Sequence, residues 1–401
     1  MAVQEYPAPE GVSRLQTRAF GVGAIALLLA IYGAVHSPQT FFASYLMSFL
    51  LVLGVALGSL GLVMLQHLTS GHWGIIIRRP LESATRTLPF LVIAFLPIAI
   101  FGMQYLYNGH GDDKGWLNAP PSGEGVLSEF QKSWLTHSGY LIRAVIYFAV
   151  WLALMFIFNI WSKQQDTNKT DRELRQRFKV LAGPGIILYV FAMSFAAIDW
   201  VMSISPHWAS TIYGFIFVGG QLISSMAFMI AVVVLLSRTE PFSGILQPRH
   251  LHDLGKLLLA FVMLWAYFDF SQLLIIWAGN QPEEISFYRT RLYGEWGVVA
   301  VIVVVFHFFV PFFLLLSQDL KRRAQIISKI ALWLILMRLV DLFWMTRPEF
   351  TSSAVPSWLD LVLPIALGGL WLGFFAFNLK QCPLLPLGDP NLAEAIKNHE
   401  H

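Results

Sequence analysis

The sequence predicts an all-α, polytopic integral membrane protein with about ten transmembrane helices and no soluble domain of its own. Of its 401 residues, 56% are hydrophobic and 14% are aromatic, whereas only 13% are charged. A typical soluble protein has about 25% charged residues and needs less apolar sequence to build its core. Long apolar stretches recur along the chain, and together with this composition they indicate repeated membrane crossings.

Ten stretches are long enough to span a bilayer. About 20 mostly apolar residues are required, because about 30 Å of hydrocarbon is crossed at about 1.5 Å per residue. The predicted spans lie near residues 19–35, 42–66, 87–106, 141–161, 181–203, 212–236, 254–278, 294–316, 326–345 and 358–379. We expect residues 1–401 to form a single membrane domain of two four-helix bundles plus two peripheral helices.

The positions of Lys and Arg predict the orientation. Both termini and alternate connections hold 20 of these residues, and the opposite connections hold 5. Basic residues gather on the cytoplasmic side of multi-pass proteins, so we expect both termini and the basic segment 163–179 in the cytoplasm. These cytoplasmic Lys and Arg residues account for the net charge of +3, and we infer no nucleic-acid partner from it. No cleavage signal precedes the first span, which we expect to be retained.

Residue counts exclude several cofactors. Cys382 is the only cysteine, so the chain cannot supply an iron–sulfur cluster, a CxxCH haem attachment or a cysteine-rich zinc site. A bis-histidine haem needs two facing histidines in the membrane, and His307 is the only one well inside a predicted span. Nucleotide-binding and hydrolase motifs are also missing from the sequence. We expect no cofactor bound by this chain and no autonomous enzymatic chemistry.

Ionisable residues inside the predicted spans are the candidate functional residues, because each costs about 2.5 to 3.5 kcal/mol to insert. Arg338 and Asp341 are three residues apart, which places them on one helix face within reach of a salt bridge. They form either a structural ion pair or a pair that also transfers protons. Asp269 has Tyr267, Ser271 and Gln272 on the same helix, which indicates a hydrogen-bonded chain or an Asp bonded to a neighbouring helix.

Three further candidates lie near proline residues. Asp199 and His207 flank a Ser-Pro turn, where Pro206 is expected to end the helix at a water-accessible mouth. The alternative to a water-accessible mouth is that Trp200 and Trp208 anchor this turn at the membrane interface. Pro311 has no amide hydrogen to give the carbonyl of His307, so that carbonyl is left free for water or another side chain.

The ends of the spans suggest other surfaces. Arg143 is expected either to extend toward the water or, with Tyr105, to line a pocket for a quinone head group. The connections 108–140, 280–293 and 346–357 carry acidic and aromatic residues and are expected to form an extracytoplasmic docking surface or variable loops.

Three strings resemble a known family: SYLMSFLLVLGVALGSLGLVMLQHL, AIDWVMSISPHWASTIYG and WAYFDFSQLLIIWAGNQPEE. In combination they are similar to the polysulfide-reductase-type membrane subunits of bacterial alternative complex III, and the similarity covers nearly the whole chain. Length and the ten-span layout resemble the smaller such subunit, called the F subunit or quinone-binding subunit 2.

The resemblance implies membership of a quinol:electron-acceptor oxidoreductase. The expected partners are a larger homologous membrane subunit, an iron–sulfur subunit, multihaem cytochrome c subunits and membrane lipid. Iron–sulfur clusters and haem c would belong to those partners, and a quinone is the one candidate ligand here. With the residues discussed above, the proton-path hypothesis comprises Asp199, His207, Asp269, Gln272, His307, Arg338 and Asp341.

Three functions remain open. The first is a cofactor-free membrane subunit of a quinol:cytochrome c oxidoreductase, or one with another acceptor, that scaffolds the complex and conducts protons. The second is a quinone-binding anchor that itself oxidises quinol next to an iron–sulfur subunit. The third is a secondary transporter, against which the lack of clear inverted repeats in the sequence counts.

Overall fold

The computed structural model describes residues 6–109, 115–118, 127–167, 172–389 and 392. Within these residues all regular structure is helical, which confirms the all-α prediction. Parts of two predicted features lie outside the described residues. They are 110–114 and 119–126 of the connection 108–140, and 168–171 of the basic segment 163–179.

Long helices follow one another along the described part of the chain, and two of them contain a π-helical segment. They are α1 (Glu10–His36), α2 (Pro38–Thr69), α4 (Leu88–Pro97) continued through η3 (Ile98–Gly102) into α5 (Met103–Leu106), α7 (His137–Thr167), α8 (Arg172–Trp200), α9 (Tyr213–Leu236), α11 (Pro248–Gly279), α13 (Gly294–Val303) continued through η6 (Val304–Phe309) into α14 (Val310–Leu316), α16 (Ala324–Thr346) and α17 (Leu359–Leu379). The short helices in the connections are η2 (His72–Gly74), α3 (Arg78–Thr85), η4 (Trp116–Asn118), α6 (Glu129–Trp134), η5 (Met202–Ile204), α10 (Phe242–Ile245), α12 (Pro282–Leu292) and α15 (Gln318–Arg322).

Nine helices in the described part of the chain are long and apolar enough to cross a membrane. This confirms the polytopic membrane class. The predicted span 326–345 corresponds to α16, which is 23 residues long but is not among the nine. Its length suffices for about 30 Å of hydrocarbon. Every 18-residue stretch of α16 contains the charged residues Lys329, Arg338 and Asp341, whereas each of the nine helices has an apolar stretch of that length with at most two charged residues.

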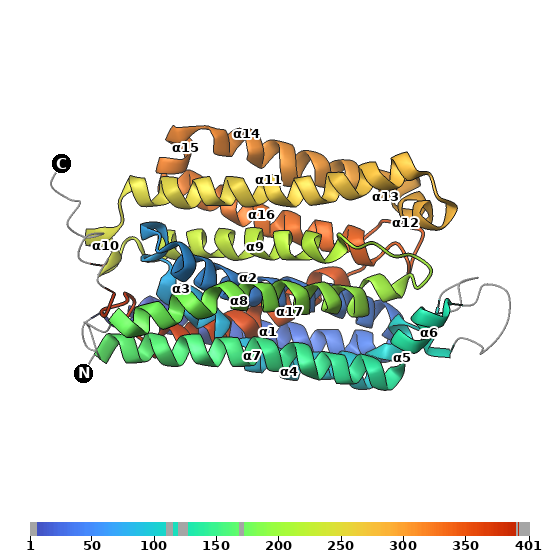
Figure 1. Cartoon of the computed structure of the whole chain (residues 1–401), viewed down its shortest axis with the longest axis horizontal. Coiled ribbons are helices and arrows are strands. Elements are labelled where there is room, and N and C mark those ends of the chain that lie inside the picture. The colour runs from blue at the N-terminus through green and yellow to red at the C-terminus, as the bar shows by residue number, and fades with distance from the viewer. Residues whose placement is uncertain (1–5, 110–114, 119–126, 168–171, 390–391, 393–401) are drawn as a thin grey trace.

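The long helices lie side by side along the long axis of the molecule (Figure 1). One four-helix bundle contains α2, α4 with α5, α7 and α8, and the second contains α9, α11, α13 with α14, and α16. Helices α2 and α9 pack along each other and join the two bundles. Helices α1 and α17 pair with each other against α2. The predicted two bundles plus two peripheral helices are confirmed.

Small residues allow α1 and α17 to approach closely. A Cβ atom on Gly23 would lie 2.6 Å from the amide nitrogen of Leu370, and one on Gly369 would lie 2.8 Å from the Cα of Gly23. In lipid, where hydrophobic burial gives no drive for helices to associate, such close van der Waals contact between backbones holds helices together.

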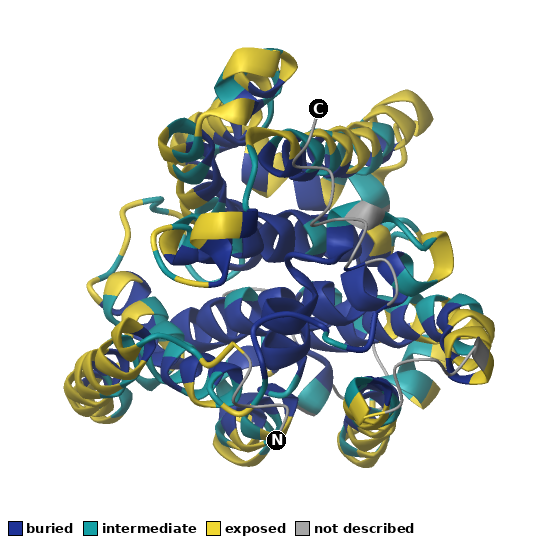
Figure 2. Cartoon of the chain, turned by 90° about the vertical axis from the view of Figure 1, so that its left-hand side faces the viewer, coloured by how far each residue is buried: buried dark blue, intermediate teal, exposed yellow. Residues whose placement is uncertain are grey.

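Burial follows the pattern of a membrane protein. Buried residues fill the centre of the bundle, and exposed residues form its perimeter (Figure 2). Large apolar side chains lie on that perimeter, including Leu28 at 69%, Ile93 at 65% and Val145 at 69% exposure. A belt of exposed aliphatic side chains suits contact with hydrocarbon.

The two ends of the described chain lie at the same end of the bundle. The amide of Leu384 donates a hydrogen bond to the carbonyl of Tyr6 at 3.0 Å. We call this the termini end. Helices α6 and α12 lie at the opposite end, which we call the α12 end (Figure 1).

Candidate functional site

The core of the second bundle contains a buried ion pair. Arg338 and Asp341, on consecutive turns of α16, are 3% and 2% exposed, and the guanidinium donates directly to the carboxylate. The predicted salt bridge is confirmed. Gly220 of α9 lies against the guanidinium, where a Cβ atom would come 2.2 Å from the Cζ of Arg338. The sequence of α9 therefore leaves room for this arginine.

His307 lies beside this ion pair. Its Nδ1 is 3.9 Å from Oδ2 of Asp341, and the ring is completely buried. The indole of Trp265 stacks on the imidazole, with ring centroids 4.3 Å apart. Neither ring nitrogen has a hydrogen-bond partner among the described residues. His307 is thus a polar group held in an apolar and aromatic environment next to a carboxylate.

The backbone around His307 is a π-helical segment, η6, within the long helix α13–α14. Pro311 follows four residues after His307 and has no amide hydrogen to continue the α-helical ladder. A π segment is one of the usual ways in which a helix accommodates such a defect, and such segments are frequent at functional sites.

Asp269 of α11 is the fourth acidic or basic residue of this region. It is half-buried and within electrostatic reach of Asp341 and Arg338. No hydrogen bond or ion pair joins its carboxylate to another described residue. We call Asp269, His307, Arg338 and Asp341 the charged cluster. The structure brings these four predicted residues into one bundle.

Gln272, three residues after Asp269 on α11, forms hydrogen bonds to two residues at the α12 end. Its Oε1 accepts a hydrogen bond from Ser210 at 2.7 Å, and its Nε2 donates to the hydroxyl of Tyr288 at 2.9 Å. Burial raises the pKa of the Tyr288 hydroxyl above its ordinary value, and the negative charge of Asp269 raises it further. Tyr288 therefore stays protonated at neutral pH. Tyr267 is 65% exposed and points away from the core, so the prediction that it joins this chain is wrong.

The α12 end of the second bundle has its own buried cation. Arg291 is 1% exposed and donates to Glu349 at 2.7 Å and to the carbonyl of Met345 at 3.0 Å. The hydroxyl of Tyr213 has no hydrogen-bond partner among the described residues. Tyr213 begins α9, seven residues before Gly220, and lies within electrostatic reach of both Arg291 and Asp341.

Asp199 belongs to a separate site in the first bundle. It is completely buried, and Arg143 donates to both of its oxygens at 2.7 and 2.9 Å. The indole of Trp134 and the hydroxyl of Tyr147 donate two more hydrogen bonds, at 2.8 and 2.7 Å. The expectation that Arg143 extends toward the water is wrong, because the buried carboxylate offers it a bidentate partner. We call these four residues the Asp199 site.

The remaining two predicted residues are His207 and Tyr105. His207 is exposed in the turn after η5, and Tyr105 stacks on Phe42 with ring centroids 5.3 Å apart. Tyr105 does not line the pocket that borders the Asp199 site. Arg143 does not line that pocket either, so the predicted quinone site at Tyr105 and Arg143 is a different place from it and stays a prediction.

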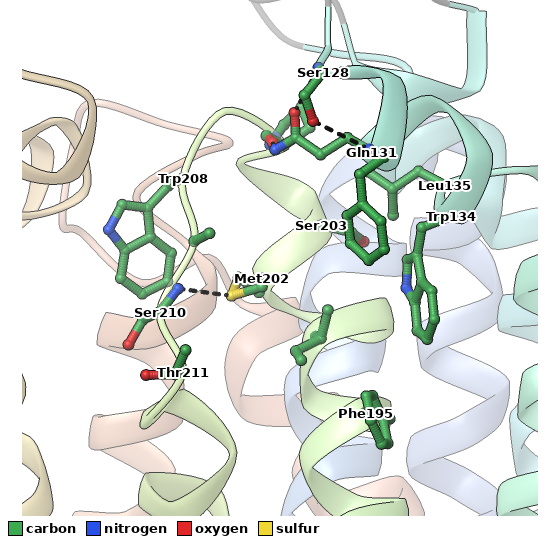
Figure 3. A pocket seen from close by; sticks show the side chains of 14 residues that line it. Ser128, Gln131, Trp134, Leu135, Phe195, Met202, Ser203, Trp208, Ser210 and Thr211 are labelled. Atoms are coloured by element: carbon green, nitrogen blue, oxygen red, sulfur yellow. Dashed lines mark hydrogen bonds between the residues drawn. The ribbon is translucent and has the colours of Figure 1, made fainter.

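An apolar pocket of about 470 Å³ lies at the α12 end between α6 and the α8–α9 connection. Figure 3 shows Trp134 and Phe195 on one wall and Trp208 and Ser210 on the other. The first wall reaches the Asp199 site through Trp134, on whose ring Arg143 lies at 4.2 Å. The second wall reaches Gln272 through Ser210. The pocket thus borders both polar sites.

Sequence reasoning missed a buried ionic network at the termini end. Arg78 donates to Glu82 at 3.0 Å and to Asp389 at 2.8 Å, and Arg79 donates to Glu82 at 2.8 Å. The spacing of Arg78 and Glu82 by one helical turn was the available signal. Nothing in the sequence indicates Asp389, because it is more than 300 residues away.

A second buried pair was also missed, at the start of α17. Asp360 accepts a hydrogen bond from Ser44 at 2.6 Å and lies 3.4 Å from Nε of Arg347. Burial lowers the pKa of Arg347, and the nearby Asp360 opposes that shift. The presence of Asp360 inside the predicted span 358–379 was the signal that could have identified it.

Comparison with known proteins finds no family model and no curated protein that matches this chain. In the residues that the structure describes, no three His, Cys, Asp or Glu side chains are grouped so as to hold a metal ion.

Proposed function

We propose that this chain is a membrane subunit of a bacterial quinol:electron-acceptor oxidoreductase, which scaffolds the complex and conducts protons through its second bundle. The three sequence strings support the oxidoreductase assignment. The charged cluster, with completely buried His307 beside Asp341, is the observation that carries the proton-conducting role. The protein would lie in the cytoplasmic membrane with the termini end in the cytoplasm.

The cluster suits proton hopping for two reasons. First, a charge in the hydrocarbon is costly. Arg338 and Asp341 balance each other's charge, whereas Asp269 has no ion-pair partner among the described residues, so a proton is the group that can balance its charge. A neutral imidazole carries one donor and one acceptor nitrogen, so His307 can accept a proton on one side and release one on the other. The chemistry is proton transfer without a covalent intermediate.

Polar groups lead away from the cluster in both directions. Toward the α12 end lie the unpaired hydroxyl of Tyr213 and the Ser210–Gln272–Tyr288 chain. Toward the termini end, Ser225 of α9 and Ser59 of α2 are hydrogen-bonded at 2.8 Å. Buried polar groups without a protein partner are ordinarily satisfied by ordered water, which we propose completes the path.

The α12 end supports a docking role. Trp277, Tyr293 and Phe130 there are 75%, 74% and 71% exposed. Exposed aromatic side chains of this kind are enriched where proteins meet partners and at the membrane interface. We propose that the iron–sulfur and multihaem cytochrome c subunits bind at this end, and that the larger homologous membrane subunit packs in the bilayer plane.

Purification from the native membrane tests the assignment. The tagged chain, extracted in a mild detergent, is expected to bring down subunits with haem c and iron–sulfur clusters and to show quinol:cytochrome c activity. A colourless protein purified alone, with transport activity after reconstitution, contradicts the proposal and favours a secondary transporter.

The apolar pocket favours quinone binding as a second candidate function. Its volume of about 470 Å³ and its aromatic walls suit a neutral ring with an isoprenoid tail. A photoreactive quinone is then expected to label residues 128–135 of the purified complex, and Ala209→Phe, which fills the pocket, to prevent labelling. Ala278→Phe, at an exposed position of α11, is the control. Labelling that is insensitive to Ala209→Phe contradicts this candidate.

A further inference from the structure

A pocket of about 570 Å³ at the termini end of the first bundle is independent of both polar sites described above. It lies between the α3–α4 junction, the last turns of α7 and the segment that follows α17. We call it the basic pocket. One part of its lining is cationic and the other part is apolar, an arrangement that suits an amphipathic ligand.

Arg86 provides a charge without a direct ion-pair partner in this pocket. Its Nε donates to Oδ1 of Asn159 at 2.7 Å, and its NH1 group donates to Sγ of Cys382 at 2.8 Å. Neither acceptor is a carboxylate, and no carboxylate among the described residues forms an ion pair with Arg86, although Glu82 lies within electrostatic reach of it. Asn159 is itself fixed by hydrogen bonds to Thr85 and Met155. The guanidinium is thus held at the pocket and remains able to bind an anion.

Lys163 adds a second charge close by. It lies four residues after Asn159 on α7, and therefore one turn nearer the water on the same helix face. It is exposed and forms no ion pair with a described residue. Arg79 also lines the pocket, but Asp166 pairs with it. The lining therefore carries an excess positive charge from Arg86 and Lys163.

The apolar part of the pocket faces the hydrocarbon. Phe156 and Ile160, on the α7 turns that lead from the basic residues into the membrane, are 51% and 53% exposed. Pro89 at the start of α4 lines the pocket beside them. A ligand in this pocket meets two cations at the membrane surface and aliphatic or aromatic side chains below them.

We propose that the basic pocket binds an anionic phospholipid, with its phosphate between Arg86 and Lys163 and an acyl chain along Phe156 and Ile160. The predicted orientation places the pocket in the cytoplasmic leaflet, where basic pockets between helices meet anionic lipid head groups. The apolar floor distinguishes a lipid from a soluble anion or an acidic peptide, which need no hydrocarbon contact. The site connects α4, α7 and the segment after α17, so the bound lipid stabilises their packing.

Cys382 provides a reporter, because it is the only cysteine of the chain and lines the pocket. The complex is stripped of lipid in detergent, and alkylation of Cys382 by N-ethylmaleimide is followed by peptide mass spectrometry. Phosphatidylglycerol, phosphatidylcholine or inorganic phosphate is then added. We expect phosphatidylglycerol alone to slow alkylation and to raise the thermal midpoint. Equal protection by phosphatidylcholine, or protection by inorganic phosphate, overturns the proposal.

Variants locate the site. Lys163→Gln, at an exposed position, and Arg86→Gln are each expected to weaken phosphatidylglycerol protection about fivefold. Arg322→Gln, an exposed cation of α15 at the same end of the molecule, is the charge-matched control and should have no effect. Because Arg86 touches the thiol, the ratio of rates with and without lipid is compared within each variant. Unchanged protection in Lys163→Gln overturns the proposal, whether or not Arg86→Gln folds.

Discussion

Gly220 of α9 lies against Arg338 of α16 so closely that a Cβ atom would come 2.2 Å from the guanidinium carbon. This contact sets the position of the arginine, and through it the position of Asp341. The charge in the bundle core belongs to α16, but the space for it depends on a glycine of α9.

Replacement of this glycine tests the packing. We expect Gly220→Ala to displace Arg338 and to destabilise the protein by about 1 to 3 kcal/mol, the usual cost of overpacking a core. Gly368→Ala on α17, where no atom lies within 4 Å of the added Cβ, is the matched control and should be neutral or slightly stabilising. Thermal unfolding in detergent measures both. Equal effects of the two substitutions would contradict the Gly220–Arg338 contact.

His307 should contribute to function more than to stability. Because neither ring nitrogen has a partner among the described residues, His307→Leu removes a buried polar group without breaking a hydrogen bond to any of those residues. We expect a thermal midpoint within about 2 °C of the parent, or higher. Gln272→Leu, which leaves Ser210 and Tyr288 without their partner, is the comparison and should destabilise by about 1 to 3 kcal/mol. Strong destabilisation by His307→Leu would show that His307 is structural.

The Asp199 site should behave in the opposite way. Asp199→Asn leaves the charge of Arg143 uncompensated, and breaking a buried ion pair costs about 3 to 5 kcal/mol. Trp134→Phe removes one hydrogen bond to the same carboxylate and should cost about 1 kcal/mol. Thermal unfolding and the yield of assembled complex report both changes. A stable Asp199→Asn variant with lowered proton transfer would place Asp199 in the path after all.

Tyr288 provides a smaller test of the outer polar chain. Tyr288→Phe removes the hydroxyl that accepts from Gln272 and should cost about 1 kcal/mol. If protons leave through this chain, the variant also lowers the rate of proton release. Tyr32→Phe, at a 62% exposed tyrosine of α1, is the control. Identical behaviour of the two variants would remove Tyr288 from the path.

The fold class could be predicted because the bilayer imposes a simple length and polarity rule on each helix. The ion pair of Arg338 and Asp341 could be predicted because both residues lie on one helix, where spacing fixes geometry. Contacts between helices could not be predicted in this way. Arg143 reaches Asp199 across 56 positions of sequence, and only the packing of α7 on α8 brings them together.

The buried network at the termini end shows the same limit. Arg78 lies between the predicted spans 42–66 and 87–106, so the charge count places it in a cytoplasmic connection. The structure buries it to 1% exposure, since Glu82 and Asp389 supply the compensating charges. Counting charges predicts the side of the membrane but not whether a charge is solvated.

Proton translocation by the purified complex in liposomes tests the central proposal most directly. We expect Asp269→Asn, and the double variant Asp341→Asn with Arg338→Gln, which leaves no buried charge uncompensated, to keep the complex assembled and to lower the number of protons translocated per electron. Glu129→Gln, an exposed carboxylate on α6 with 93% side-chain exposure, serves as the control and should match the parent. An unchanged ratio of protons to electrons in both cluster variants, with electron transfer intact, would contradict proton conduction through the second bundle.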